Sequence, residues 1–380
     1  MRRTIFETEH DDFRETVGGF LRREAVPNAE AWEEAGMVPR AFWEAAAAQG
    51  LVGFEAPDEY GGLGLRDFRF NAVIDEEVAY TGAVGDGFTM QNDIIVPYLL
   101  DLTNDEQKQR WVPPFVRGEL IVAIAMSEPG AGSDLQGMAA TARREGDEYV
   151  LSGTKTFVTS GIAADLVIVA ARTKPEGGKD GFSLLAVERD TPGFERGRKL
   201  EKSGRWAQDT AELFFNDVRV PVENRLGEEG RGFRYLMANL PRERLSMAVS
   251  AVAAAEHALD ITLTYVKERT AFGQPIGSFQ ANRFALAELV TKVGAARAYV
   301  DRCISALLVD ELTPAEAAGA KAWTTDLQCE VVDRCVQLHG GYGYMREYEI
   351  SRLWRDARVQ RIYGGTNEIM YEIVGRSLGL

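Results

Sequence analysis

The hydrophobic and polar positions divide the chain into three stretches of different texture. Residues 1–118 contain segments with helical spacing, such as "DDFRETVGGFLRREA", "PRAFWEAAAAQGLVG" and "NDEQKQRWVPPFVRGEL". From about residue 121 to 222 the apolar runs are short, rich in β-branched and aromatic residues, and broken by polar turns, as in "LVIVAAR" and "FSLLAVE". Such runs are typical of strands, and "REGDEYVLSG" resembles a hairpin. The middle stretch therefore predicts a small β domain.

From about residue 230 the pattern is helical again. Two sets of apolar residues recur every three or four positions and predict two packed helices of a bundle: Leu245, Val249, Val252, Leu259, Leu263 and Val266, then Leu286, Leu289, Val293, Ala296, Val300, Cys303 and Leu307. Thr313, Pro314 and Glu316 have the spacing of an N-cap, a first-turn proline and a capping-box glutamate. The helix that they begin should end at Gly340–Gly341. By the same reasoning, Pro241 is predicted to open a helix.

The order of helices, strands and helices predicts an α+β fold. No segment alternates strand and helix, so a Rossmann domain is not expected. We predict an N-terminal helical domain at residues 1–119, a middle β-barrel-like domain at 120–226 and a C-terminal four-helix bundle at 227–380.

Composition and charge narrow the classes of function. The net charge of −15 argues against a nucleic-acid partner, because phosphate-binding surfaces are basic. Apolar residues make up 45% of the chain but form no run long enough for a membrane span. The acidic N-terminal segment does not resemble a secretory signal, and three cysteines without CxxC spacing fit a reducing compartment, so we expect a cytoplasmic protein. Three scattered histidines predict no metal site.

Four motifs carry candidate chemistry, and each also has an ordinary structural reading. "AMSEPGAGSDLQG" (125–137) could present backbone N–H groups to an anion or a polar ring, although it does not complete GxGxxG. "KTFVTSG" (155–161) should place Phe157 and Thr159 on one face of a strand, where they could contact a flavin or simply be half-buried. Arg269 in "ERTAFGQPIGSFQ" could bind phosphate or complement a helix dipole. "QLHGGYGYMREYEISRLWRDAR" (337–358) reads as a helix C-cap and turn.

Together and in this order, the motifs resemble those of the acyl-CoA dehydrogenase family of flavoenzymes. The resemblance extends over essentially the whole chain and is most specific in "AMSEPGAGSD" and "QLHGGYGYMREYEISRLWRD". It implies the same three-domain fold, a homotetramer, and FAD bound between the β domain, the bundle and a neighbouring subunit. It also implies α,β-dehydrogenation of an acyl-CoA thioester to the trans-2-enoyl-CoA, as in fatty acid β-oxidation, with an electron-transfer flavoprotein as electron acceptor.

The resemblance also assigns the flavin contacts residue by residue. In the middle domain they fall on Ile124, Met126, Ser127, Ser133, Phe157 and Thr159. Contacts to the diphosphate and adenosine of a neighbouring subunit's FAD fall on Arg269, Phe272 and Gln280. The loop that receives the same FAD is matched by Gln337, Gly340 and Gly341. The last contacts, on the flavin's phosphate side, fall on Gly365, Thr366 and Glu368.

The catalytic base is where this chain departs from most of the family. In the family a glutamate removes the α-proton while a hydride leaves the β-carbon for the flavin, and most members carry that glutamate at the position of Gly364, in "RIYGGTNEIM". The isovaleryl- and long-chain-type enzymes instead place the base on a bundle helix, in a motif resembling "LPRERL" (240–245), which indicates Glu243. The local alternative is that Glu243 is a first-turn glutamate that stabilises a helix dipole.

The substrate contacts implied by the resemblance are Ser133, Arg244, Gly364 and Arg376. Pro241 replaces a polar residue that contacts the pantetheine in the medium-chain type, so that contact is not expected. A helix-borne base favours a long or branched acyl chain. Two other functions stay open: an acyl-CoA oxidase, which is usually a longer chain, and a non-catalytic flavin-binding subunit of a heteromer, if Glu243 is only a helix charge.

Overall fold

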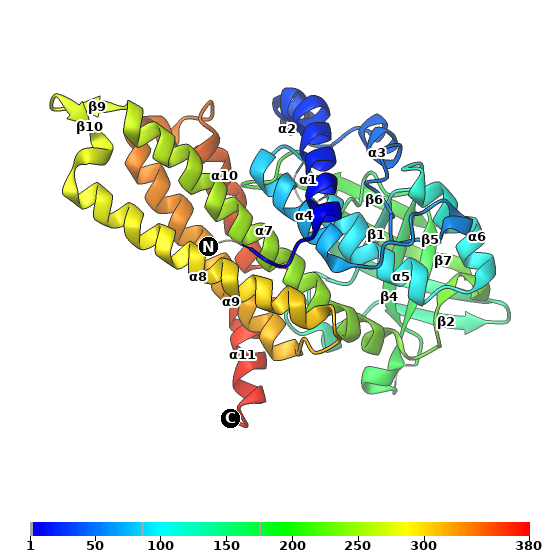
Figure 1. Ribbon diagram of the computed structural model, residues 1–380. Coiled ribbons are helices and arrows are strands. Elements are labelled where there is room, and N and C mark those ends of the chain that lie inside the picture. The colour runs from blue at the N-terminus through cyan, green and yellow to red at the C-terminus, as the bar shows by residue number, and fades with distance from the viewer. Residues whose placement is uncertain (1–2, 85–86, 175) are drawn as a thin grey trace.

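The computed structural model describes residues 3–84, 87–174 and 176–380 (Figure 1). The N-terminal helices lie beside a central sheet, and a bundle of long helices extends from the other side of these helices. This arrangement confirms the predicted α+β class. No helix within the described residues is long and apolar enough to cross a membrane.

The N-terminal part is helical and packs around aromatic side chains. Phe42, Trp43 and Phe88 contact one another edge to face in its core. Asn104 and Gln107 form a capping box that starts the last helix, as the polar "NDEQ" segment predicts. The helices are α1 (Thr8–Phe20), α2 (Ala29–Ala35), α3 (Arg40–Ala47), α4 (Phe68–Thr81), α5 (Val96–Asp101) and α6 (Asp105–Val116).

The middle part is a mostly antiparallel sheet with the strand order β6-β7-β3-β2-β4-β5-β8, and β1 pairs in parallel with β4. The predicted hairpin is β2–β3, closed beyond the pair Glu145–Glu148. Contacts of β1 with β3 and of β5 with β7 show that the sheet wraps around its own apolar core. The strands are β1 (Val122–Ala125), β2 (Thr141–Glu145), β3 (Glu148–Thr159), β4 (Leu166–Arg172), β5 (Phe182–Glu188), β6 (Phe194–Lys199), β7 (Thr210–Pro221) and β8 (Arg225–Leu226).

The C-terminal part is built on three long helices, with two shorter ones and a small hairpin. Its elements are α7 (Gly232–Glu268), β9 (Thr270–Ala271), β10 (Gln274–Pro275), α8 (Gln280–Leu307), α9 (Pro314–His339), α10 (Glu349–Ala357) and α11 (Asn367–Ser377). The predicted apolar seams are buried in the bundle core, except that Leu263 and Leu307 are half-buried. The predicted capping box of Thr313 and Glu316 is present, and α9 ends before Gly340, whose φ is +60°.

The prediction that Pro241 opens a helix is wrong. Pro241 lies inside α7, which begins at Gly232. Docking on the sheet sets this start, because a Cβ on Gly232 would lie 2.8 Å from the backbone of Ser183 in β5. Buried Leu236 and Leu240 then continue the helix up to the proline. Glu243 therefore lies about three turns inside the helix, and the first-turn dipole role considered for it does not apply.

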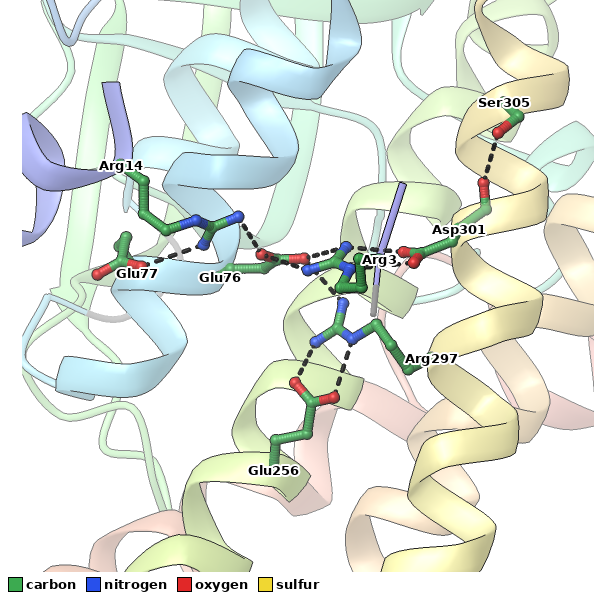
Figure 2. A network of polar contacts seen from close by, with 8 residues as sticks. All are labelled: Arg3, Arg14, Glu76, Glu77, Glu256, Arg297, Asp301 and Ser305. Carbon is green, nitrogen blue, oxygen red and sulfur yellow. Dashed lines mark hydrogen bonds and ion pairs between the residues drawn. The ribbon is translucent and has the colours of Figure 1, made fainter. Parts of the chain in front are cut away.

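A buried ion-pair network joins the N-terminal helices to the bundle (Figure 2). Glu76 of α4 pairs with Arg3, Arg14 and Arg297, with N–O distances of 2.8, 2.6 and 2.8 Å. Arg297 of α8 also binds Glu256 of α7 through two nitrogens, at 3.0 and 2.5 Å. We call these five residues the Glu76 network. It fixes α4 against α7 and α8.

Candidate active site

Glu243 is buried at the junction of α7 with α5 and with the loop before α11. Only 3% of its surface is exposed. Burial raises the pKa of its carboxyl group to about 7, although the neighbouring Arg244, Tyr98 and Arg242 act in the opposite direction. The hydroxyl of Tyr98, from α5, lies 3.4 Å from a carboxylate oxygen of Glu243. A carboxyl group with such a pKa can take up and release a proton near neutral pH.

The glycine pair of the last loop lies against the same turn of α7. Gly364 and Gly365 have φ values of +64° and +92°, a backbone conformation that favours glycine. The carbonyl oxygen of Gly364 accepts a hydrogen bond from Nε of Arg244 at 3.3 Å. A Cβ on Gly364 would lie 2.5 Å from Sδ of Met247, one helical turn beyond Glu243. The structure thus brings together the position that lacks a carboxylate and the helix turn that carries one.

A buried lysine fixes the other side of this turn. Lys321 of α9 is fully buried and donates to the carbonyl oxygen of Gly365 at 2.8 Å and to Oδ1 of Asn367 at 2.9 Å. Burial lowers the pKa of Lys321 to about 8, and the charge of Arg244 adds to this effect. The two consecutive glycine carbonyls are therefore held by cations from two different bundle helices. Beyond them, Thr366 caps α11 and accepts from the N–H of Ile369 at 3.4 Å, while Glu368 is exposed in its first turn.

The first two sequence motifs meet at the edge of the sheet. Ile124 lies in β1. Just beyond this strand, the backbone carbonyl of Met126 accepts a 2.9 Å hydrogen bond from buried Lys155. The carbonyl of Ser127 accepts from the N–H of Thr156 at 2.9 Å. Ser133 is exposed in the loop that follows. The loop of residues 126–133 is thus held against β3, next to Phe157.

Simple strand alternation does not place Phe157 and Thr159, contrary to our expectation. The pairing of β3 with β7 shifts register between Lys155 and Val158, and Phe157 has a φ of +57°. This bulge turns the Phe157 ring outward, so that 72% of it is exposed. Thr159 is half-buried and pairs with Thr210. An aromatic ring held exposed by an unusual backbone conformation is typical of a ligand-contacting position.

The remaining predicted cofactor contacts lie at the far end of the bundle, away from the sheet (Figure 1). Arg269 caps the end of α7, and its guanidinium carbon lies 5.8 Å from the centre of the Tyr342 ring. Phe272, in the β9–β10 hairpin, is 95% exposed. Gln280 begins α8, and the other exposed members of this group are Gln337, Gly340 and Gly341. Within one chain, this group does not lie beside the loop of residues 126–133.

Arg376 is not among the residues that contact Glu243 or the Gly364–Gly365 turn. It lies in the last turn of α11, where this helix projects from the bundle, and its Nε pairs with Glu372 at 2.6 Å (Figure 1). No group of three or more potential metal ligands occurs among the residues that the structure describes.

Comparison with known proteins identifies the family. Residues 7–119, 123–218 and 230–379 match the N-terminal, middle and C-terminal domains of acyl-CoA dehydrogenases. The chain belongs to the acyl-CoA dehydrogenase family. The mitochondrial long-chain specific acyl-CoA dehydrogenase of Sus scrofa is 47% identical over 378 residues, which cover 99% of this chain and 88% of the pig protein.

Two solved structures extend the comparison. An acyl-CoA dehydrogenase from Geobacillus kaustophilus has a TM-score of 0.97 and 48% identity, with 99% of each chain covered. A glutaryl-CoA dehydrogenase from Mycobacterium smegmatis, in complex with FADH2, has a TM-score of 0.91 and 26% identity, covering 98% of this chain and 95% of that one. This acyl-CoA dehydrogenase is thus an FAD-dependent oxidoreductase.

The residues at the sheet edge suit such a cofactor. Nothing lies within 4 Å of a Cβ built on Gly130 or Gly132, so the backbone of this loop is open to a close approach. Phe157 offers an exposed ring beside it, and Ser127 and Thr159 offer hydroxyl groups. An open backbone, an aromatic face and hydroxyl donors match a flat ring with a polar edge.

Sequence reasoning missed three residues of this acyl-CoA dehydrogenase site. Tyr98 is one apolar-looking residue in "IIVPYLL", and only its burial reveals the need for a polar partner. Met247 continues an ordinary helical seam. Lys321 gave the clearest signal, because a lysine on the alanine-rich face of "AAGAKAW" must be buried with partners.

Proposed function

We propose that Glu243 is the base that removes the α-proton of an acyl-CoA thioester, and that the acyl chain is long or branched. The observation that supports Glu243 is its burial beside the Gly364 turn, with a pKa near 7. Such a group is substantially ionised at neutral pH and still accepts a proton readily. Gly364 cannot act as a base, so the carboxylate comes from α7.

The mechanism follows from this position. FAD, when bound, supplies the acceptor for the hydride that leaves the β-carbon. Glu243 receives the α-proton on a carboxylate oxygen, and the apolar surroundings that raise its pKa also stabilise the protonated form. Arg244 holds the Gly364 carbonyl and so fixes the loop beside the base. Arg244, Gly364, Ser133 and Arg376 remain the predicted substrate contacts.

Phe157, Ser127 and Thr159 are the residues that would contact the flavin ring. Ile124, Met126 and Ser133 would line the same edge. Arg269, Phe272 and Gln280 of a second copy would reach the phosphates and adenosine, in an assembly of at least two copies such as the predicted homotetramer. Sedimentation of the FAD-loaded protein tests this assembly, and a monomer that holds FAD tightly would contradict it.

Substitution of Glu243 by Gln tests the base. We expect Glu243→Gln to retain FAD. Under anaerobic conditions, acyl-CoA should reduce the FAD of this variant about a thousandfold more slowly, or slower still, because the general base is lost. Glu77→Gln, which removes a carboxylate of α4 that pairs with Arg14 of α1, serves as the matched control and should reduce FAD at the normal rate. Rapid bleaching of the flavin in Glu243→Gln would refute the assignment and favour the non-catalytic reading of this residue.

The pH dependence gives a second test of the same base. Because Glu243 must be ionised and burial raises its pKa to about 7, kcat/KM should rise with pH through about 7 and then level off. An unchanged kcat/KM between pH 5.5 and 8.5 would argue against a base with this pKa.

The acyl chain is tested with a panel of substrates. The similarity to a long-chain specific enzyme and the helix-borne base support long or branched chains. We expect the highest kcat/KM with such thioesters, and a preference for butyryl-CoA would contradict the proposal.

Rapid reoxidation of the reduced enzyme by oxygen would favour the oxidase, whereas slow reoxidation with fast transfer to an electron-transfer flavoprotein would favour the dehydrogenase. The cytoplasmic location stays a prediction.

A further inference from the structure

Tyr98 is a fully buried tyrosine whose hydroxyl group faces the proposed base. It lies in α5, directly after a π-helical segment, η4 (Thr89–Ile95), and Pro97. A π-helix has wider turns than an α-helix, so it rotates the residues that follow, and such segments are frequent at functional sites. Tyr98 is the third residue after this segment, and its hydroxyl group is directed at Glu243 of α7.

Two polar side chains of α7 meet this hydroxyl group. The Tyr98 hydroxyl donates to Oε1 of Glu243 at 3.4 Å, and the side chain of Asn239 is near enough to lower the pKa of the same phenol. Asn239 and Glu243 are four residues apart and therefore lie on one face of the helix. A buried tyrosine hydroxyl requires a partner, and both of these partners belong to the turn that carries the base.

We propose that Tyr98 is a positioning residue for catalysis: its hydroxyl group donates a hydrogen bond to the ionised carboxylate of Glu243, orients it and stabilises its charge. This inference rests on the proposed role of Glu243. The phenol has one hydrogen to donate, and Oε1 of Glu243 accepts it.

The protonation of Tyr98 agrees with this direction. Burial raises the pKa of Tyr98 well above its ordinary value, and the negative charge of Glu243 raises it further. The phenol therefore remains protonated when Glu243 is ionised, and the hydrogen bond runs from tyrosine to glutamate. A hydrogen bond to the charged form lowers the pKa of a carboxyl group, which opposes the effect of burial on Glu243.

The charged groups around Glu243 have other partners as well. Arg244 of α7 donates to the Gly364 carbonyl, and Arg242 of α7 pairs with Glu55 of the N-terminal part. Lys321 of α9 donates to Gly365 and Asn367. Arg244 and Arg242 still act on Glu243 through their charges. Tyr98 is the uncharged donor in this group, so its removal changes the hydrogen bonding of the base without changing the net charge.

Tyr98→Phe tests the proposal in the FAD-loaded enzyme. It keeps the ring and removes only the hydroxyl group. We expect the rise of kcat/KM with pH to move upward by about one pH unit. Activity should fall by about tenfold at pH 6 and stay close to that of the unmodified enzyme at pH 9, because a pH-dependent loss of this form follows from a raised pKa alone. Merely structural damage would lower activity equally at both pH values.

Two further variants complete the test. Tyr149→Phe removes another buried phenol, which contacts Glu229 and Arg225 in the middle domain, and should leave the pH profile unchanged. Asn239→Leu removes a polar neighbour that lowers the pKa of Tyr98, so it should weaken Tyr98 as a donor and shift the profile in the same direction by a smaller amount.

An unshifted profile in Tyr98→Phe with normal FAD content would overturn the proposal. If Tyr98→Phe does not fold, an unshifted profile in Asn239→Leu decides against it in the same way. An inactive Glu243→Gln beside either result leaves the proposed base intact, whereas an active Glu243→Gln would remove the basis of both proposals.

Discussion

Glu76 and Glu243 are both almost fully buried, but their surroundings differ. Glu76 contacts three arginines, Arg3, Arg14 and Arg297 (Figure 2). Burial acts to raise its pKa, yet the three cations outweigh this effect and the pKa lies below its ordinary value. Glu243 has a tyrosine hydroxyl at 3.4 Å and arginines that also bind other groups, so burial prevails and its pKa rises to about 7.

The difference shows that burial alone does not make a base. Glu76 is a permanent anion that joins three helices, and its lowered pKa keeps it ionised at neutral pH. Glu243 exchanges a proton because its charge is only partly compensated. The number of cations in contact with a buried carboxylate thus separates the structural Glu76 from Glu243, our proposed base.

Glu76→Gln should give the largest loss of stability. The substitution leaves Arg3, Arg14 and Arg297 with an uncharged partner in a buried site, and breaking such a network costs about 3–5 kcal/mol. The effect should decline in acid, because the stabilisation by a carboxylate with a lowered pKa begins to fall below its ordinary pKa of 4.5 and is lost as pH falls through the lower folded-state pKa. Denaturant unfolding in a pH series from 7 to well below 4.5 measures this, and a loss that vanishes already above pH 4.5 would contradict a lowered pKa.

Glu243→Gln should act on stability in the opposite sense. The folded state binds the proton of Glu243 more tightly than the unfolded chain does, so this stabilisation is complete below about pH 4.5 and is lost as pH rises through about 7. The pKa difference from 4.5 to about 7 corresponds to about 3 kcal/mol. We therefore expect the variant to gain stability relative to the unmodified protein as pH rises, up to about this amount at pH 9. If the unfolding free energies of the variant and the unmodified protein changed with pH in parallel from pH 5 to pH 9, Glu243 would not have a raised pKa.

Arg297→Lys should have an intermediate effect. Lysine keeps the charge but cannot repeat the two contacts to Glu256 together with the contact to Glu76. We expect a loss of about 1–2 kcal/mol in unfolding free energy with normal flavin reduction. Slower flavin reduction in this variant would show that the Glu76 network also acts on the site.

Glu77→Gln should have the smallest effect. Oε1 of Glu77 pairs with Nη1 of Arg14 at 3.1 Å, and both side chains are partly exposed. Such pairs contribute less than about 1 kcal/mol. A loss as large as that of Glu76→Gln would mean that the number of charges, and not their burial, determines the stability of the network.

Local chemistry in the sequence predicted local structure well. Thr313, Pro314 and Glu316 specify a helix start among themselves, because each contact of a capping box lies within one turn. The sequence also predicted the change from helices to strands near residue 121 and the apolar seams of the bundle. These features depend on neighbours in the chain, which the sequence displays directly.

Features that depend on residues distant in sequence could not be predicted in this way. Pro241 marked no boundary, because contacts of Gly232 with β5 start α7 earlier. The bulge at Phe157 arises in the pairing of β3 with β7, which strand alternation does not show. The resemblance named Glu243, yet its pKa depends on a tyrosine that is distant in sequence.

Arg3 gives the start of the chain an unexpected importance. Its guanidinium binds Glu76 of α4 and Asp301 of α8 at once (Figure 2). An N-terminal affinity tag that displaced Arg3, or a protease that clipped the chain just behind it, would therefore loosen the seam between two domains.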